Sequence, residues 1–383
     1  MPSTALRKQL VANVQRLVVK VGTNVLTDPA GRLDKALIAR IARQLALLHG
    51  RRLQVTLVTS GAVGAGMGIA GLASRPKETP LLQACAAIGQ PGLMTLYARA
   101  MARYNIRCGQ LLVTRTDFEQ RTRYVNIRNT IQALHRLNAM AVINENDSIA
   151  VDELDRFADN DTIAALVSNL LRADLTVLLT VVDGLLNAEG QRIDLVSSLS
   201  DEVLKMARAT RSSLGSGGMA SKLHAVGMVT EAGEAAVIAN GREHDVLLRL
   251  LDGDRIGTFF APAPNKLSAR HRWIRSAVRP AGQISLDAGA AEAVLRRGKS
   301  LLPRGITEVA GKFPQGAIVR LVGPDGRIIA HGVTNYASAE LARIKGARSS
   351  EIAALLGRKR CDEAVHRDNL VLLAGKETEN KRA

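Results

Sequence analysis

Residues 16–22 read RLVVKVG, a short apolar strand that ends in a lysine, a valine and a glycine turn. A lysine at a strand end beside Gly22 can place its ammonium group where backbone N–H groups also point, which suits a phosphate. Lys20 taken alone is more simply explained as a solvated lysine. A functional interpretation therefore needs support from the rest of the chain.

Strand-like and helix-like segments alternate from this strand to about residue 262. Apolar residues at helical spacing predict helices, among others at residues 81–104 and 161–171. The alternation predicts an α/β fold, a three-layer α/β/α sandwich with a mainly parallel sheet, in which ligands bind at the carboxyl ends of the strands. Further strands are predicted at residues 54–59, 108–114, 139–144, 174–182 and 235–240, the last of this part.

The pattern changes at the A-P-A-P run of residues 261–264. A basic stretch follows, and then come short strand-like pieces and turns that are typical of a small β-rich domain. We therefore predict a first domain at residues 1–265, a basic linker at 266–280, a small β-rich domain at 281–360 and a C-terminal tail at 361–383.

Composition narrows the class of protein. The chain is 46% apolar and 23% charged, which is typical of a globular protein. No apolar run approaches the roughly 20 residues of a membrane span, and no signal peptide is recognisable, so we expect a cytoplasmic protein with no membrane contact. The three cysteines, Cys85, Cys108 and Cys361, lie far apart and are best explained as reduced thiols.

The net charge of +17 indicates anionic partners. An RNA partner and a set of anionic enzyme substrates both fit this charge. Aromatic residues make up only 3% of the chain, and residues 281–383 contain just Phe313 and Tyr336. Because single-stranded nucleic acid is usually bound by stacking on aromatic side chains, the composition favours the enzyme.

Glycines follow the second predicted strand, in SGAVGAGMG at residues 60–68, and would let a ligand approach the backbone. Residues 66–71 also match G-x-G-x-x-G, a fingerprint of dinucleotide sites. That match begins six residues beyond Ser60, and no acidic residue lies between Glu78 and Asp117 to bind a ribose. We interpret it as a chance match.

Carboxylates and amides gather in NENDS at residues 144–148 and in DND at residues 159–161. The first could be a solvated acidic loop, and Asp159 or Asn160 could simply cap the helix that follows. In an enzyme that acts on amino acids, the same groups could bind an α-ammonium group or orient a catalytic lysine.

A glycine-rich loop, GSGGMASK at residues 215–222, runs into a predicted helix and ends in Lys222. Such a loop can cradle a phosphate, although it lacks the P-loop pattern and could be a linker. Two lysines beside glycine turns, together with carboxylates at strand ends, match phosphoryl transfer, which depends on positioning and charge neutralisation. The histidines show no metal-ligand spacing and no G-x-S-x-G elbow is present, which disfavours metalloenzymes and hydrolases.

Five motifs in this order resemble the amino-acid kinase superfamily and, within it, the bacterial glutamate 5-kinases: VVKVGTNVL, VTSGAVGAG, INEND, DND and GSGGMASK. LLPRGI, GKFPQG and IAHG in the C-terminal part resemble the PUA domain that many bacterial members carry. The resemblance covers about residues 16–370. It implies ATP-dependent phosphorylation of the side-chain carboxylate of L-glutamate to L-glutamyl 5-phosphate, the first step of proline biosynthesis, with Mg²⁺.

The resemblance also implies roles for single residues, and assigns no metal ligand to a protein side chain. Lys20 and Lys222 would neutralise the transferring phosphoryl group, and Asp161 would orient both lysines. Ser60, Asp147 and Asn160 would hold glutamate. The residues implied to contact ATP are Lys20, Thr180, Val181, Ser216, Gly217, Gly218, Met219, Ala220, Ser221 and Lys222.

Position 181 departs from the family pattern, since members usually carry an acidic residue there and this chain has Val181. The change puts nucleotide affinity and base choice in question rather than the transfer chemistry. The resemblance further implies a homo-oligomer and coupling to glutamate-5-semialdehyde dehydrogenase. The alternatives are an N-acetylglutamate kinase-like enzyme, disfavoured by the VTSGA pattern and the C-terminal extension, and an RNA-binding protein acting through the PUA-like domain.

Overall fold

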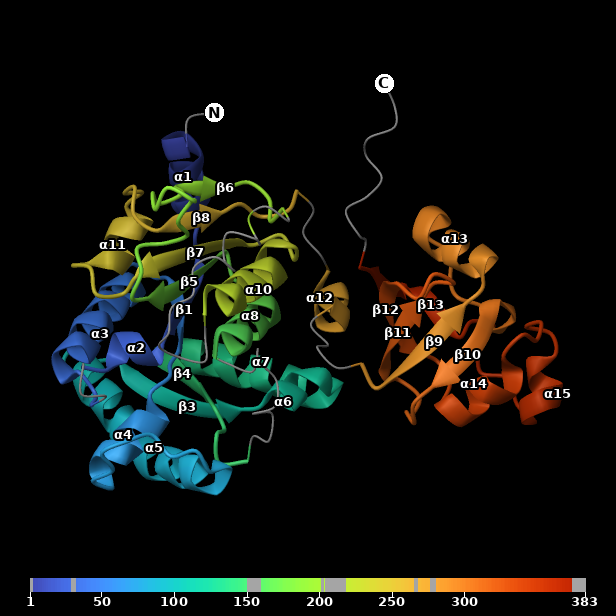
Figure 1. The fold of residues 1–383 in the computed structure, drawn as a ribbon, viewed down its shortest axis with the longest axis horizontal. Coiled ribbons are helices and arrows are strands. Elements are labelled where there is room, and N and C mark those ends of the chain that lie inside the picture. Colours follow the sequence, from blue (N-terminus) through green and yellow to red (C-terminus); the bar gives the residue numbers. More distant parts are fainter. Residues whose placement is uncertain are drawn as a thin grey trace. The chain divides into compact units, whose positions relative to one another are not determined.

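The chain folds into two compact units, Met1–Lys266 and Leu267–Ala383 (Figure 1). The computed structural model describes residues 3–28, 32–149, 160–200, 203, 218–264, 268–275 and 280–373. Each unit has its own sheet and its own hydrophobic core, so each is described by itself.

An eight-stranded sheet forms the centre of the first unit, in the order β3-β4-β2-β1-β5-β7-β8-β6. The strands are β1 Arg16–Val21, β2 Gln54–Val58, β3 Arg107–Val113, β4 Ala139–Glu145, β5 Leu175–Thr180, β6 Leu195–Val196, β7 Ala235–Asn240 and β8 Thr258–Phe260. Strand β1 pairs in parallel with β2 and with β5. Among the described strands of this sheet, β7 and β8 form the one antiparallel pair, so the predicted mainly parallel sheet is confirmed.

The prediction that residues 235–240 form the last strand of this part is wrong, because β8 follows β7 and extends the sheet. All three residues of β8 are buried, as is expected of a strand that pairs on both of its edges. A run of three residues is too short to show the alternation by which strands are recognised in a sequence.

Helices cover both faces of this sheet, which confirms the predicted three layers (Figure 1). Helices α3, α5 and α11 pack their apolar side chains on one face, while α8 and α10 lie on the other. The helices of the first unit are α1 Ser3–Ala12, α2 Thr23–Leu26, α3 Lys35–Gly50, α4 Ala62–Ile69, α5 Thr79–Ala102, α6 Arg115–Glu119, α7 Arg121–Arg136, α8 Asn160–Leu171, α10 Met219–Thr230 and α11 Val246–Leu251.

The central strand β1 carries a lysine on a buried face. Side chains alternate along a strand, so Leu17, Val19 and Val21 enter the core beneath α3 and α5. Val18 and Lys20 point to the opposite face, where α8 packs against β1. The alternation therefore delivers the Lys20 ammonium group to the carboxyl edge of the sheet, under the beginning of α8.

Helices α4 and α5 cross with their backbones in contact. A Cβ atom on Gly66 would lie 1.7 Å from the carbonyl oxygen of Cys85, and one on Gly89 would lie 2.0 Å from that of Ala62. These two positions exclude every other residue, because real Cβ atoms do not approach so closely. The glycine at position 66 thus serves helix packing. Gly61, the residue before α4, has a φ of +103°, which favours glycine.

The second unit contains a five-stranded sheet in the order β10-β9-β11-β12-β13. Its core includes Ile284, Val319 and Tyr336. The strand-rich C-terminal domain predicted from the sequence is thereby confirmed. The elements are α12 Ala269–Arg275, β9 Gly282–Leu286, α13 Ala288–Arg297, the 3₁₀ helix η2 Pro303–Gly305, β10 Ile306–Ala310, β11 Ile318–Val322, β12 Ile328–Thr334, α14 Ser338–Ile344, α15 Ile352–Leu356 and β13 Val365–Leu372.

Two predicted boundaries of this unit are wrong. Strand β13 lies in the stretch predicted as a tail from residue 361, and it pairs antiparallel with β12. Its polar centre, residues 366–369, concealed the strand in the sequence. The predicted linker at 266–280 contains α12, which packs on β12 and β13 with Trp273 and Ile274 buried. The second unit thus begins before residue 269 and includes residue 372.

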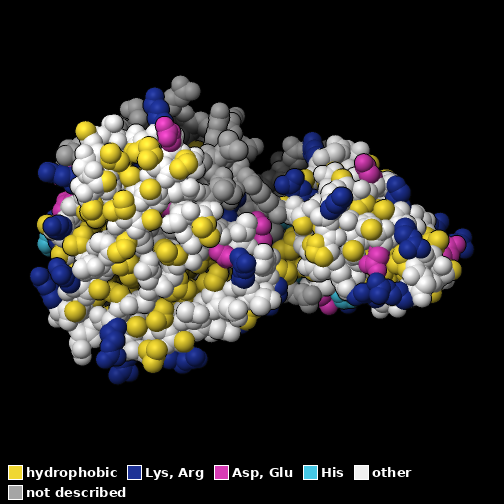
Figure 2. Space-filling view, turned by 90° about the horizontal axis from the view of Figure 1, so that it is seen from below, with side chains coloured by type: hydrophobic (Ala, Val, Ile, Leu, Met, Phe, Trp, Pro, Cys, Tyr) yellow, Lys and Arg dark blue, Asp and Glu magenta, His cyan; other side chains and the backbone are white. Residues whose placement is uncertain are grey.

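Exposed apolar side chains gather on α4, α5 and the segment between them. They are Ile69, Leu72, Leu81 and Ile88, each more than 40% exposed. Figure 2 shows many hydrophobic side chains on this side of the first unit. No helix in the described ranges is both long enough and apolar enough to cross a membrane.

Candidate active site

Three neighbouring strands, β4, β2 and β1, bring polar residues to one edge of the sheet. Lys20 lies near the end of β1, Ser60 follows β2, and Asn144 lies near the end of β4. Helices α8 and α10 begin at the same edge, with Asn160 and Met219. Because the first N–H groups of a helix lack partners within it and carry partial positive charge, this edge suits anions.

Lys20, Asp161 and Lys222 form a buried ionic cluster at this edge. Nζ of Lys20 lies 2.6 Å from Oδ1 of Asp161, and Nζ of Lys222 lies 3.0 Å from Oδ2. The two lysines are 5% and 7% exposed, and Asp161 is 0% exposed. The structure therefore joins the three residues that the sequence singled out as catalytic, and each oxygen of the carboxylate meets a lysine from a different element.

The carboxylate of Asp161 is held ionised by its neighbours. Burial alone would raise the pKa of Asp161, but the charges of Lys20 and Lys222 lower it below its ordinary value. Asp161 also lies in the first turn of α8, where the helix dipole favours a negative charge. Two cations and one anion leave the cluster with one excess positive charge.

This excess charge defines what the cluster can do. Two buried lysines beside one carboxylate favour an anionic ligand, whose charge would add to that of Asp161. Cations fixed in place before a reaction stabilise charge that develops on a transferring group such as phosphoryl. The cluster is therefore suited to neutralising a phosphoryl group between two other anions.

Amide and hydroxyl groups form a second cluster beside the first. Nδ2 of Asn160 donates to Oγ of Ser60 at 2.9 Å and to Oδ1 of Asn144 at 3.1 Å. Nδ2 of Asn144 donates in turn to Oε1 of Gln90 on α5, at 2.8 Å. Because Asn160 precedes Asp161, the two clusters share one turn of α8. Oδ1 of Asn160 is buried and has no hydrogen-bond partner within the described residues, so it retains its capacity to accept one.

Two other candidates for this cluster are less defined. Asp147 is half-buried in the turn after β4, three residues beyond Asn144, and its role stays a prediction. Asp159, named with the D-N-D segment, lies outside the described residues.

The residues predicted to bind the nucleotide lie at the starts and ends of neighbouring elements. Gly218 precedes α10, and Met219, Ala220 and Ser221 form its first turn together with Lys222. Thr180 ends β5, which neighbours β1 on the sheet. The prediction for Ser216 and Gly217 falls outside the described residues.

Position 181 carries an exposed apolar side chain. Val181 is 42% exposed and follows the last residue of β5. The acidic group near it is Asp183, whose Oδ1 accepts a hydrogen bond from Asn240 at 2.9 Å. Asp183 therefore supplies a carboxylate close to the strand end, although not at position 181 itself.

No cluster of three or more His, Cys, Asp or Glu side chains that could hold a metal ion occurs in the part of the chain that the structure describes. Both oxygens of Asp161 already contact lysines. The carboxylate of Asp161 is therefore already shared between two cations.

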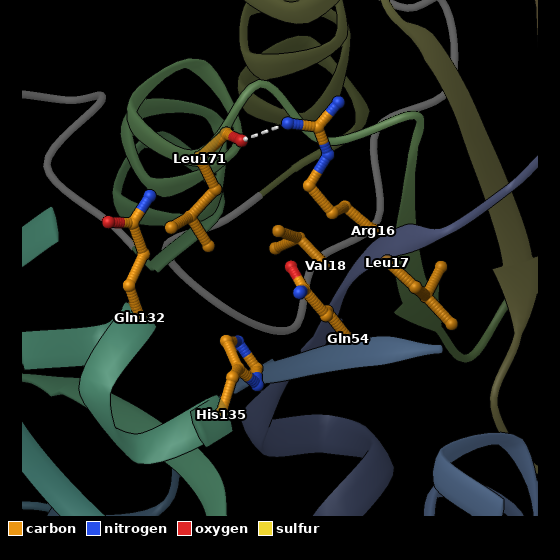
Figure 3. A pocket seen from close by; sticks show the side chains of 7 residues that line it. All are labelled: Arg16, Leu17, Val18, Gln54, Gln132, His135 and Leu171. Carbon is orange, nitrogen blue, oxygen red and sulfur yellow. Dashed lines mark hydrogen bonds between the residues drawn. The ribbon is translucent and has the colours of Figure 1, made fainter. Parts of the chain in front are cut away.

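A small cavity of about 70 Å³ lies at the opposite, amino-terminal edge of the sheet (Figure 3). The guanidinium of Arg16 donates there to the carbonyl oxygen of Leu171, and His135 contacts Oγ1 of Thr56 at 3.2 Å. Burial lowers the pKa of His135 below its ordinary value. None of the predicted site residues lines this cavity.

Sequence reasoning missed two members of the polar cluster. Asn144 stood in the quoted NENDS segment, and its place at the end of β4 was the signal that could have selected it. Gln90 lies inside α5, far from every motif, and the one local signal is the run G-Q-P-G at residues 89–92 within a predicted helix.

Family models match both units of the chain. The model of the amino acid kinase family matches residues 15–240, and that of the PUA domain matches residues 282–356. The first match contains every residue of the two clusters.

Curated relatives match nearly the whole chain. The glutamate 5-kinase of Geobacter sp. (strain M21) is 43% identical over 374 residues, which are 96% of this chain and 100% of that protein. The glutamate 5-kinase of Moorella thermoacetica is 43% identical over 95% of this chain and 97% of that protein. A carbamate kinase from Giardia lamblia bound to AMP-PNP aligns with a TM-score of 0.48 at 20% identity, over 66% of this chain and 100% of that one.

Proposed function

Because this chain belongs to the amino acid kinase family and, within it, to the glutamate 5-kinases, we propose that the Lys20–Asp161–Lys222 cluster carries out its ATP-dependent phosphorylation of the glutamate side chain. The observation that carries this proposal is the buried carboxylate bridging two lysines at the carboxyl edge of the sheet. The product is L-glutamyl 5-phosphate, the first intermediate of proline biosynthesis.

The reaction needs charge neutralisation more than proton transfer. The side-chain carboxylate of glutamate is already an anion at neutral pH, so its attack on phosphorus needs no general base. The obstacle is the approach of this anion to the anionic phosphate chain. Lys20 and Lys222 would reduce that repulsion, and Asp161 would hold both ammonium groups in place.

The polar cluster beside the lysines would hold glutamate. Oδ1 of Asn160 can accept a hydrogen bond from an α-ammonium group, and the hydroxyl of Ser60, which accepts from Asn160, can still donate one. Asp147 would add a negative charge opposite the ammonium group. This arrangement would orient the substrate carboxylate toward the lysines, which lie beside Asn160 in α8.

The start of α10 would contact the phosphates of ATP. Its first-turn N–H groups carry partial positive charge beside Lys222, and Ser216 and Gly217 would extend the contact. Thr180 and Val181 would lie against the nucleoside. Val181 makes that contact apolar, and Asp183 would provide the nearby acidic group.

Mg²⁺ would reach the site with ATP. This ion keeps several water molecules and binds one or two carboxylates plus substrate phosphates, so it does not require a cluster of protein ligands. When bound, it supplies further positive charge to the phosphate chain.

The catalytic residues all precede residue 240, and we assign catalysis to the first domain, residues 1–265. The aromatic side chains of the second unit, Trp273, Phe313 and Tyr336, are all buried. They are therefore not available to stack with bases, which disfavours RNA as the partner of this unit.

Three broader predictions go with this function. The exposed apolar surface of α4 and α5 favours a homo-oligomer, which sedimentation velocity would test. The reactive acyl phosphate favours coupling to a dehydrogenase that reduces it, glutamate-5-semialdehyde dehydrogenase. The expected cytoplasmic location stays a prediction.

An assay of acyl phosphate formation tests the proposed function. Purified protein, ATP, Mg²⁺ and hydroxylamine are incubated with L-glutamate, and the acyl phosphate is trapped as a hydroxamate. We expect hydroxamate with L-glutamate and none with N-acetylglutamate or without ATP. Hydroxamate from N-acetylglutamate alone would favour the N-acetylglutamate kinase alternative.

A further inference from the structure

The orientation of the Asn144 amide is fixed by the backbone. The backbone N–H of Glu145 donates to Oδ1 of Asn144 at 2.9 Å. An N–H group can only donate, so Oδ1 must face it, and Nδ2 must point the other way. Nδ2 then needs an acceptor, because Asn144 is 1% exposed and a buried amide without a partner is costly.

Gln90 supplies that acceptor. Its Oε1 lies 2.8 Å from Nδ2 of Asn144, and its own side chain is 7% exposed. Nε2 of Gln90 makes no hydrogen bond to any described residue, so the side chain contributes one hydrogen bond and that bond goes to Asn144. The crossing of α4 and α5 at Gly66 and Gly89 brings Gln90 to this point, directly after the close approach of Gly89 to the backbone of Ala62.

The same oxygen of Asn144 also accepts from Asn160. Oδ1 is shared between the backbone of Glu145 and Nδ2 of Asn160, which reaches Ser60 with its second hydrogen. If the Asn144 amide turned, Asn160 would lose an acceptor and Ser60 would lose its fixed neighbour. The hydrogen bond that Asn144 donates to Gln90 therefore helps, together with the backbone N–H of Glu145, to hold the amide on which Asn160 and Ser60 depend.

We propose that Gln90 is a positioning residue for the glutamate subsite, and that it acts through Asn144 on Asn160 and Ser60. The inference rests on the proposed function, because it takes Asn160 and Ser60 as the groups that hold glutamate. It predicts a selective effect on glutamate, since the hydrogen bond of Gln90 goes to Asn144 in the polar cluster rather than to the lysine cluster.

The substitution Gln90→Met tests the proposal with little change in volume. It removes one acceptor and leaves Nδ2 of Asn144 unpaired, and we expect the KM for glutamate to rise about tenfold. We expect kcat and the KM for ATP to stay within about twofold of wild type. The matched control is Gln132→Met on α7, an exposed residue at the opposite edge of the sheet (Figure 3).

A second variant covers the case in which Gln90→Met does not fold. Gln90→Asn keeps a polar amide but is one methylene group shorter, so its oxygen no longer reaches Asn144. We expect the same selective rise in the KM for glutamate. A KM for glutamate that stays within about twofold of wild type in the folded variants would overturn the proposal.

A double-mutant cycle with Asn160→Ala separates positioning from a general structural role. If Gln90 acts through Asn160, Gln90→Met adds less than about twofold to the KM for glutamate once Asn160 is truncated. Independent, multiplying effects, or equal rises in both KM values, would contradict positioning. Absence of glutamate-dependent activity in the wild type would instead contradict the proposed function, so the two failures are distinguishable.

Discussion

The two ends of strand β1 each carry a basic residue on the same face of the sheet, but the two residues differ in exposure and in the end of helix α8 that they meet. At the amino end, Arg16 is paired with Asp174 at 3.4 Å, and its side chain is 40% exposed. At the carboxyl end, Lys20 is paired with Asp161 at 2.6 Å, and its side chain is 6% exposed. Helix α8 spans both ends of the strand and meets each cation with a different terminus.

The dipole of helix α8 explains why the two cations differ in their effect on stability. The carbonyl oxygen of Leu171, at the negative end of α8, accepts from Arg16, which is a favourable arrangement for a cation. Lys20 meets the positive end of α8, where a cation is disfavoured unless a carboxylate intervenes. The arrangement at Arg16 stabilises the fold, whereas the one at Lys20 opposes stability and fits a site that awaits an anion.

The largest effect is expected when the bridging carboxylate is lost. Asp161→Asn leaves two buried lysines facing a neutral amide, and we expect the free energy of unfolding to fall by about 3–5 kcal/mol. Urea denaturation measures this change. Asp252→Asn is the matched control, because its pair with Arg51 is also short, at 2.8 Å, but exposed. We expect a change below about 1 kcal/mol there.

Acid should act on the same carboxylate. The pKa of Asp161 is lowered from 3.8 in the folded protein, so the unfolded chain binds a proton more readily. The stabilisation is fully present above pH 3.8 and is lost as the pH falls through the lower folded value. Asp161→Asn should remove this part of the acid dependence, and an unchanged acid dependence would contradict the assignment.

Loss of one lysine should affect turnover more than folding. Lys222→Ala removes a cation from the transferring phosphoryl group but leaves Asp161 paired with Lys20, and we expect kcat to fall by about 10²–10³. Steady-state kinetics and thermal melts on the same preparation separate the two effects. A variant within a few-fold of wild type in kcat would show that α10 does not contribute to catalysis.

Loss of the Asn160 amide should weaken the binding of one substrate, glutamate. Asn160→Ala removes the donor to Ser60 and Asn144, and we expect the KM for glutamate to rise about tenfold while the KM for ATP changes little. Separate titrations of the two substrates check this. Equal rises in both KM values would mean that Asn160 has no preference for the glutamate side of the site.

The smallest effect belongs to the amino end of the sheet. Burial lowers the pKa of His135 from 6.5 in the folded state, so its contribution to stability is full above pH 6.5 and declines as the pH falls through the folded value. His135→Gln should flatten the pH dependence of stability in this range without altering kinetics. A change in either KM would contradict the separation of the two ends.

Residues at strand ends could be predicted from the sequence. Lys20 and Ser60 follow apolar runs whose ends are readable, and Asn160 and Asp161 begin a strongly apolar helix. Parallel strands present their carboxyl ends at one edge, so local patterns alone bring these residues together. The sequence could not show which atoms of these residues contact one another. The structure shows that the carboxylate of Asp161 bridges the two lysines.

Gln90 and the boundaries of the second unit could not be predicted in the same way. The position of Gln90 depends on how α5 crosses α4 at Gly66 and Gly89, which is a tertiary contact without a local pattern. Strand β13 has a polar centre and helix α12 is rich in arginine, and the two pack on each other and on β12. These two elements depend on contacts with residues that are distant in the sequence, so the periodicity of their own residues does not predict them.

One measurement tests the central claim most directly, namely that the carboxyl end of β1 is the site of phosphoryl transfer. Glutamate-dependent hydroxamate formation is compared in wild type, Lys20→Ala and Arg16→Ala, each confirmed as folded by circular dichroism. We predict that Lys20→Ala lowers the rate of hydroxamate formation by a factor of about 10²–10³. We predict that the rate of Arg16→Ala stays within a few-fold of that of the wild type. A folded Lys20→Ala variant that forms hydroxamate as fast as Arg16→Ala would contradict the claim.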